Sequence, residues 1–210
     1  CGGENGKIAA NSAAQLLLSR GITRLDGLIL THYDEDHAGG TGYFLSRFSV
    51  DRLYLPDIAD DGGLRRELEQ SFPSQIVWVR EDMCLGQTHH DLWLYPGESG
   101  KNENESSLSV LFQKKNCDIL ITGDLGVSGE EALLQRHELP KLELLVAGHH
   151  GSDTSTGTRL LKENSPDVVA ISVGENNYYG HPSKIVTERL KYYGCRVWRT
   201  DLDGTIDFRG

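Results

Sequence analysis

The sequence has no long apolar run and few cysteines. No stretch approaches the roughly 20 consecutive apolar residues of a membrane-spanning helix, and no secretory signal is visible, so we expect a soluble chain. The four cysteines, Cys1, Cys84, Cys117 and Cys195, form no CxxC pair, which argues against a disulfide framework. Cys117 and Cys195 each border an apolar run, where a buried free thiol is expected.

An excess of positive charge is also lacking, since the formal net charge is −10. This balance argues against a protein that holds nucleic acid by a general basic field. Phosphodiester chemistry stays open, because bound divalent cations would bring positive charge to the point where a phosphate must lie. What is abundant is glycine, with 24 residues, many beside His, Asp or Ser, as in loops that approach a ligand closely.

Short apolar runs alternate with helical patterns, which predicts one α/β domain over 1–210 with mixed sheets. The expected helices cover 8–21, 39–47, 63–71, 128–137, 154–164 and 183–193. The expected strands cover 26–32, 52–55, 75–80, 91–95, 107–113, 117–122, 142–147, 167–173, 195–199 and 204–208. The polar segment 97–105 is expected to be an exposed loop.

Groups that bind metals follow three of the expected strands. His32 follows LDGLIL, Asp124 follows DILITG, and His149 follows LELLVAG. Layered α/β proteins bind ligands at the edge where such strands end. We therefore expect these three groups to belong to one site.

The densest cluster is THYDEDHAGG at 31–40, which offers His32, Asp34, Asp36 and His37. In an extended stretch, residues two apart point the same way, so His32, Asp34 and Asp36 are predicted to converge. His37 is expected at the turn into the next helix. The alternative is a solvated surface loop, but two His and two Asp at this spacing before a double glycine favour a metal site.

This stretch resembles the HxHxDH signature of the metallo-β-lactamase superfamily, with Asp34 in place of the second histidine. Five further segments resemble the C-terminal domain of the ComEC family of DNA-uptake proteins: ITGD, GHHGSDTST, SVGENNYYGHPS, RTDLDGTI and ENESSLSVLF. The resemblance covers almost the whole chain and implies the αββα sandwich of the superfamily. Members usually begin with one or two more strands, so the first N-terminal strand or strands are expected to be lacking here.

The resemblance also implies a ligand set for two divalent ions. His32, Asp34 and a later histidine would hold one ion, Asp36 and His37 the other, and Asp124 would bridge them. The alternative for Asp124 is an ordinary Gly-Asp turn. An aspartate in place of a histidine hardens the donor set, so Mn²⁺ is favoured and Zn²⁺ is the alternative.

GHHGS at 148–152 adds two adjacent histidines after a buried strand. We expect His149 to be a ligand and His150 to assist catalysis or contact phosphate, because adjacent side chains diverge; both could simply be solvated instead. Ser152 is expected to begin a helix whose free backbone N–H groups suit a phosphate.

YGHPS at 179–183 is a second loop that leads into a helix, with Ser183 at its start. His181 is expected to be the last ligand or a general acid, unless it only makes a cap contact. Asn177 either contacts substrate or builds a turn. The other histidines, His89, His90 and His137, are expected at the surface.

Together these residues predict metal-assisted hydrolysis, in which a metal-activated hydroxide attacks and His181 or His150 assists the leaving group. The same apparatus opens lactams and thioesters. The resemblance implies a nuclease that cleaves DNA, expected to be single-stranded, during uptake in natural competence. It also implies a soluble domain of a bacterial cell-membrane protein whose channel portion is its partner; no other stable protein partner is inferred. The alternatives are a free-standing cytoplasmic relative, a small-molecule hydrolase of the lactamase or glyoxalase kind, and a non-catalytic DNA-guiding domain.

Overall fold

The computed structural model describes residues 5–86, 89–98, 101–102 and 104–208. The chain divides into two compact units, Cys1–Arg80 and Glu81–Gly210, and each is described by itself. The expectation of one domain over 1–210 stays a prediction. Within the described ranges, every helix is too short or too polar to cross a membrane.

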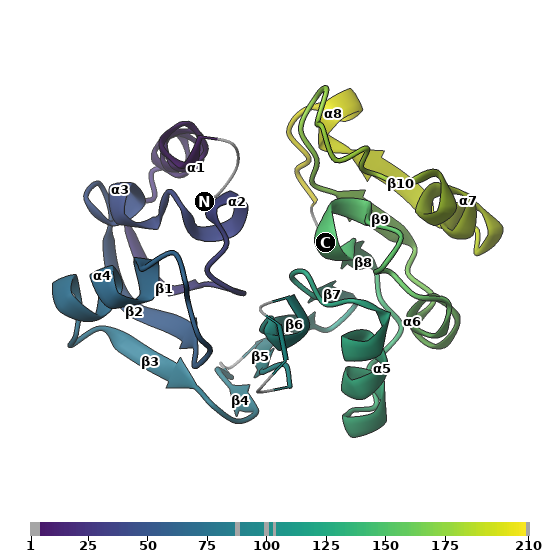
Figure 1. Ribbon diagram of the computed structural model, residues 1–210, viewed down its shortest axis with the longest axis horizontal. Helices are drawn as coiled ribbons and strands as arrows, with labels where there is room; N and C mark the ends of the chain where they lie inside the picture. Colours follow the sequence, from purple (N-terminus) through teal and green to yellow (C-terminus); the bar gives the residue numbers. More distant parts are fainter. Residues whose placement is uncertain (1–4, 87–88, 99–100, 103, 209–210) are drawn as a thin grey trace. The chain divides into compact units, whose positions relative to one another are not determined.

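The first unit is built on a parallel sheet in the order β1-β2-β3, formed by Arg24–Ile29, Ser49–Pro56 and Ile76–Val79 (Figure 1). Its helices are α1 (Gly6–Ser19), α2 (Glu35–Ala38), α3 (Thr41–Leu45) and α4 (Leu64–Ser71). One apolar cluster joins the helices to the sheet and includes Ala14, Phe44, Leu53, Leu55 and Leu68. Burial of each larger side chain contributes about 1.5–3 kcal/mol, which fixes the end of β1 where His32 follows.

The second unit is built on a seven-stranded mixed sheet in the order β10-β9-β8-β7-β6-β5-β4 (Figure 1). The antiparallel part contains β4 (Met83–Cys84), β5 (Asp91–Tyr95), β6 (Ser109–Lys114) and β7 (Cys117–Ile121). β7 continues in parallel to β8 (Leu144–Val146), β9 (Val168–Ile171) and β10 (Arg196–Arg199). The short helical turns are η1 (Asn104–Ser106), η2 (Gly148–Gly151) and α8 (Thr200–Asp203).

Parallel neighbours need a crossover, and three helices provide it: α5 (Val127–Arg136), α6 (Thr158–Asn164) and α7 (Lys184–Tyr192). Leu133, Leu161 and Leu190 of these helices pack with Leu145 and Val169 of the sheet in one core cluster, each at most 1% exposed. This topology brings the segments that follow β7, β8 and β9 to one edge of the sheet. Those segments carry Asp124, His149 and His181.

The α/β architecture with mixed sheets is confirmed, but three local expectations are wrong. Residues 204–208 form no strand, because α8 follows β10 directly and no strand of the described chain pairs with them. The helix expected over 39–47 is shorter and begins at Thr41 as α3, after α2 has ended at Ala38, and the helix expected from residue 154 begins only at Thr158. The two helix errors concern the bounds of a helix, which an apolar pattern does not mark.

The cysteines and the 97–105 loop lie largely where the sequence predicts them. Cys117 is a buried free thiol and Cys195 a partly buried one, while Cys84 is exposed. Cys1 lies outside the described residues. In the polar segment, residues 99–100 and 103 also lie outside them, and η1 begins at Asn104.

Candidate metal and active site

In the first unit the segment after β1 presents His32 and Asp34 together. His32 is fully buried; its Nδ1 lies 3.1 Å from Thr31 Oγ1 and its Nε2 lies 3.7 Å from Asp34 Oδ2. The hydroxyl of the buried Tyr33 donates to Pro56 O at 2.8 Å, which anchors the segment on the end of β2. The predicted proximity of His32 and Asp34 is confirmed.

Asp36 and His37 reach the cluster by a different route from the predicted one. They lie in α2, so the extended spacing that was expected to align Asp36 ends at Asp34. The carboxylates of Glu35 and Asp36 at the first turn favour this helix through its dipole. The His37 ring centroid lies 4.1 Å from that of His32, whereas Asp36 is exposed.

Gly6 is needed where α1 packs against the double glycine that follows His37. A Cβ atom on Gly6 would lie 2.5 Å from Gly40 N and 2.6 Å from Gly39 C, so α1 packs directly against this backbone. Helix α1 itself is capped by Asn5, whose side chain accepts a hydrogen bond from Ile8 N at 3.2 Å. The first helix therefore supports the ligand-bearing segment from behind.

In the second unit Asp124 is 3% exposed and follows β7. Its backbone N–H donates to Ser107 Oγ at 3.3 Å, and its Oδ2 lies 3.7 Å from His149 Nε2. The backbone N–H of His149 donates to Gly123 O at 3.1 Å. The ends of β7 and β8 are thus joined at the two predicted ligands.

His149 and His150 diverge because both adopt left-handed backbone conformations, with φ of 47° and 55°. Each such non-glycine residue costs on the order of 1–3 kcal/mol and needs support from its surroundings. His150 Nδ1 lies 2.7 Å from Ser172 O, so Nδ1 carries a proton and the neutral ring presents its lone pair at Nε2. An imidazole oriented by a backbone carbonyl in this way is typical of metal ligands and bases.

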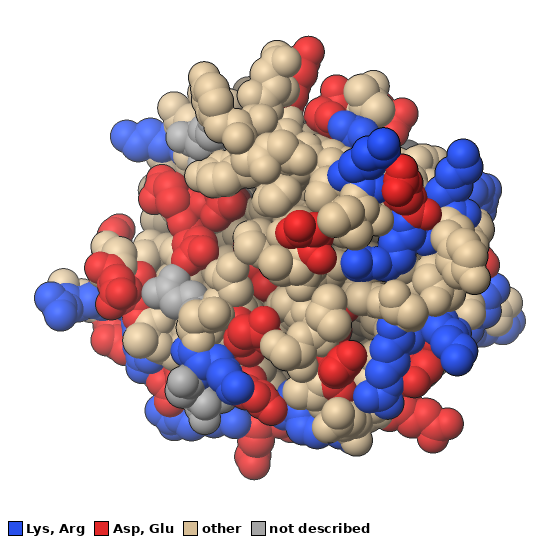
Figure 2. Space-filling model, turned by 45° about the vertical axis from the view of Figure 1, so that its right-hand side comes forward, with Lys and Arg blue, Asp and Glu red and all other residues tan. Residues whose placement is uncertain are grey.

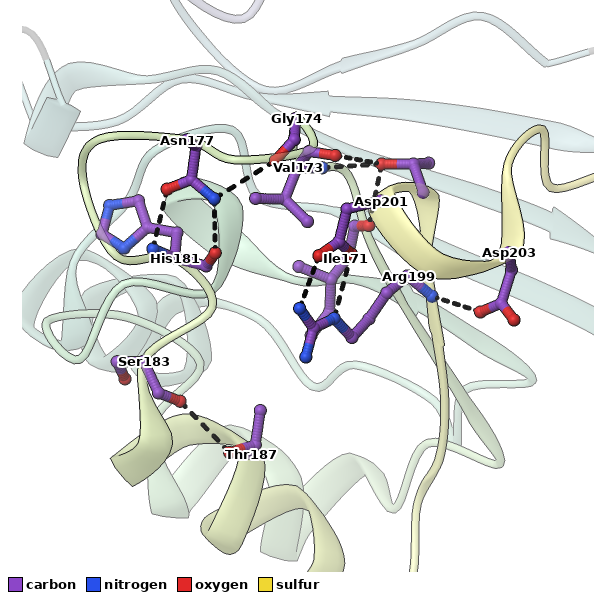
Figure 3. A network of polar contacts seen from close by, with 11 residues as sticks. Ile171, Val173, Gly174, Asn177, His181, Ser183, Thr187, Arg199, Asp201 and Asp203 are labelled. Carbon is purple, nitrogen blue, oxygen red and sulfur yellow. Dashed lines mark hydrogen bonds and ion pairs between the residues drawn. The ribbon is translucent and has the colours of Figure 1, made fainter.

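His181 is held by a closed turn, which Figure 3 shows. The Asn177 side-chain amide donates to Gly174 O at 3.2 Å and to His181 O at 2.7 Å, and its Oδ1 accepts from His181 N at 2.9 Å. Asn177 therefore builds the turn, the second of its two expected roles. Burial, and then the neighbouring His149 and His150, lower the pKa of His181.

The two serines have different outcomes. Ser183 begins α7 as expected, and its side chain accepts from Val186 N at 3.2 Å. The expectation that Ser152 begins a helix is wrong, because the chain forms further turns and α6 starts at Thr158. Ser152 instead donates from its backbone N to His149 O at 2.9 Å. Its contact with substrate stays a prediction.

Sequence reasoning missed two ionisable groups, the buried Glu130 and the half-buried His137. Glu130 on α5 is 1% exposed, and only its place on the apolar face of the helix, beside Leu133 and Leu134, signals it. His137, expected at the surface, is half-buried. Its ring stacks 4.2 Å from that of Tyr95, its Nε2 lies 3.5 Å from Asp82, and burial lowers its pKa. His90 is half-buried and His89 is exposed.

These side chains fit divalent cations. Each unit places an imidazole nitrogen 3.7 Å from a carboxylate oxygen, in a setting where His32 and Asp124 are at most 3% exposed. Buried histidines beside carboxylates form the mixed nitrogen and oxygen donor set that zinc and manganese accept. The residues can therefore hold such ions with little rearrangement within each unit.

Comparison with known sequences identifies related proteins. The Metallo-beta-lactamase superfamily matches residues 8–175. ComE operon protein 3 of Bacillus subtilis is 32% identical over 198 residues, 92% of this chain and 26% of that protein. Competence protein ComA of Neisseria gonorrhoeae is 32% identical over 195 residues, 91% of this chain and 26% of that protein. The chain spans about a quarter of the length of these relatives.

Solved structures agree in fold. CmlA, a diiron beta-hydroxylase from Streptomyces venezuelae, has a TM-score of 0.61 at 15% identity, over 84% of this chain and 43% of that one. Igni18, a metallo hydrolase from Ignicoccus hospitalis, has a TM-score of 0.54 at 16% identity, over 83% of this chain and 75% of that one. The expected fold class and the resemblance to competence proteins are both confirmed.

Proposed function

Because the chain belongs to the metallo-β-lactamase superfamily, we propose that it is a metal-dependent hydrolase that cleaves phosphodiester bonds of DNA during competence. The proposed ligands of two divalent ions are His32, Asp34, Asp36 and His37 of the first unit and Asp124 and His149 of the second. Mn²⁺ is the favoured ion and Zn²⁺ the alternative. Two histidine–carboxylate pairs carry the proposal. After β1 the buried imidazole of His32 lies beside the carboxylate of Asp34, and after β7 the buried carboxylate of Asp124 lies beside the imidazole of His149.

The proposed substrate is single-stranded DNA, and two features support it. One relative, similar over 91% of the chain, is named a competence protein. Close to His181 in the sequence, Tyr178 and Tyr179 are 95% and 82% exposed, and exposed aromatic residues can stack on unpaired bases. Figure 2 shows acidic and basic side chains interspersed, in keeping with a protein that lacks a uniform basic field. A membrane-embedded channel portion of the same polypeptide is the proposed partner.

The chemistry that two bound divalent ions supply is activation of water and neutralisation of charge on the phosphate. The chain's own residues would orient the histidine rings and transfer protons. The hydrogen bond from His150 Nδ1 to Ser172 O leaves Nε2 of the neutral ring as the nitrogen that can accept a proton. A lowered pKa makes the protonated ring of His181 a stronger acid, which suits proton donation to the leaving oxygen.

The test is incubation of the purified chain and Mn²⁺ with end-labelled single-stranded DNA. We expect cleavage by the wild type, none by Asp36→Ala, and normal cleavage by Asp61→Ala, a matched change at an exposed aspartate. Nitrocefin and S-lactoylglutathione serve as parallel substrates. Turnover of either without DNA cleavage would establish a small-molecule hydrolase instead, and DNA binding without any turnover would establish a guiding domain.

A further inference from the structure

The loop that carries His149 and His150 has a backbone conformation that its own residues do not favour. The φ angles are 47° at His149, 55° at His150 and 52° at Thr156, all in the left-handed region. Residues with a Cβ atom rarely adopt this region, so it persists only where surrounding contacts enforce it. At Thr156 such contacts come from two charged side chains, one on helix α5 and one on helix α7.

The Glu130 carboxylate of α5 accepts hydrogen bonds from two backbone N–H groups of this loop. Its Oε1 accepts from Thr156 N at 2.6 Å and its Oε2 accepts from Gly157 N at 2.7 Å, within a site where the residue is 1% exposed. Hydrogen bonds to an ionised acceptor are about twice as strong as neutral ones. Both carboxylate oxygens of Glu130 are therefore committed to the loop.

The Arg189 guanidinium of α7 donates hydrogen bonds to two backbone carbonyl groups of the same stretch. Its Nη1 donates to Ser155 O at 3.0 Å and to Thr156 O at 2.8 Å. An acid from one helix thus binds the N–H groups, and a base from another binds the C=O groups. We name this arrangement, Glu130 and Arg189 on residues 155–157, the backbone clamp.

The clamped stretch is bonded to the residues beside both predicted ligands. Ser155 Oγ donates to Gly148 O at 2.6 Å, and Gly148 N donates to Thr156 Oγ1 at 3.2 Å, directly before His149. Val127 N donates to Thr154 O at 2.8 Å, which ties the start of α5 to the same stretch. Displacement of residues 154–157 would therefore move His149 and the segment after Asp124 together.

We infer that the backbone clamp of Glu130 and Arg189 sets the positions of His149 and Asp124 for metal binding. The inference rests on the proposed function, and both members are positioning residues that act through the loop backbone. Burial raises the pKa of Glu130 to about 7, while the N–H donors and Arg189 oppose that rise. The test therefore runs at pH 8, where the carboxylate is ionised.

The experiment measures binding of Co²⁺ by its visible absorption spectrum, with Glu130→Gln compared to Glu131→Gln. Glutamine keeps the size of Glu130 but turns one acceptor into an NH₂ group that faces a backbone N–H, whereas Glu131 is its exposed neighbour on α5. We expect Glu130→Gln to weaken Co²⁺ affinity about 10- to 100-fold, the usual effect of losing a group that orients a ligand. We also expect its Co²⁺ spectrum to change, with wild-type behaviour for Glu131→Gln.

Near-ultraviolet circular dichroism of the metal-free proteins separates misplaced ligands from a lost fold. If Glu130→Gln loses its native spectrum, Arg189→Lys replaces it, with Arg159→Lys as its matched control on α6, and the same loss of affinity is expected. A folded clamp variant with wild-type Co²⁺ affinity and a wild-type Co²⁺ spectrum would overturn the inferred role of the clamp and leave the proposed function standing. Failure of the wild type to bind Co²⁺ or Mn²⁺ would overturn the proposed function and the inference with it.

Discussion

His149 Nε2 lies 3.7 Å from Asp124 Oδ2, and the backbone N–H of His149 donates to Gly123 O at 3.1 Å. Side-chain and backbone contacts therefore join the segments that follow two neighbouring parallel strands, β7 and β8. Because Asp124 is 3% exposed, its attraction for a bound cation would be only weakly screened by solvent. This pair is the part of the second unit on which metal binding depends.

Asp124→Asn should reduce metal binding without loss of fold. The amide keeps the shape of the side chain but removes the charge that attracts a cation, so we expect Mn²⁺ affinity to fall at least about 10-fold and DNA cleavage with it. Asp118→Asn, at the other end of the same strand, is the matched control. Metal content is measured by mass spectrometry after gel filtration, and undiminished content in Asp124→Asn would contradict the ligand assignment.

Glu130 should make stability depend on pH in a defined direction. Burial raises its pKa to about 7 in the folded chain, from an ordinary value of 4.5, so between these values the folded state keeps a proton that the unfolded state loses. Stability from this group is complete below pH 4.5 and falls as pH rises, by about 3 kcal/mol in all by pH 7. Urea unfolding of metal-free wild type and Glu130→Gln across this range measures the difference, and a difference that does not change with pH would refute the assignment.

Ser183→Ala should destabilise the second unit. The serine side chain accepts from Val186 N at the start of α7, and loss of such a cap costs about 1 kcal/mol. Ser12→Ala, at an exposed position within α1, should cost nothing measurable. Urea unfolding checks both variants. A raised KM for DNA at unchanged stability would show that Ser183 contacts substrate instead of capping the helix.

Tyr178→Ala and Tyr179→Ala should weaken the binding of oligothymidylate and spare small phosphodiesters. Each ring stacked on a base contributes about 1–3 kcal/mol, equivalent to a loss of about 5- to 150-fold in affinity. Tyr192→Ala removes an equally exposed ring from α7 and serves as the control, since Tyr179 and Tyr192 are both 82% exposed. Fluorescence anisotropy measures binding, and turnover of bis(p-nitrophenyl) phosphate should be unchanged. Equal oligonucleotide affinity in all four proteins would exclude a stacking role.

Motif spacing located the candidate ligands well because they follow buried strands, whose apolar runs are readable in the sequence. His32 and Asp34 lie together as their alternation predicts, and Ser183 caps a helix as its place before Lys184 predicts. Asp36 does not follow the expected alternation, because it lies in α2. Glu130 could not be recognised from motif spacing, because its role depends on a loop that follows 26 residues later.

The same limit explains the remaining errors. The sequence of 204–208 alternates like a strand, but a strand exists only where a partner completes its hydrogen bonds. The partial burial of His137 involves Tyr95, which is distant in sequence. Short-range patterns therefore predict the elements and the ligand-bearing segments, while tertiary contacts decide the clamp and the partial burial of His137.

The most direct test of the account is the number of Mn²⁺ ions bound per chain, measured by electron paramagnetic resonance titration of the wild type and two single variants. One variant, Asp36→Ala, changes the first unit, and the other, Asp124→Asn, changes the second. The account predicts two ions per wild-type chain and fewer than two in each variant. Two ions retained in both variants, or none in the wild type, would contradict it.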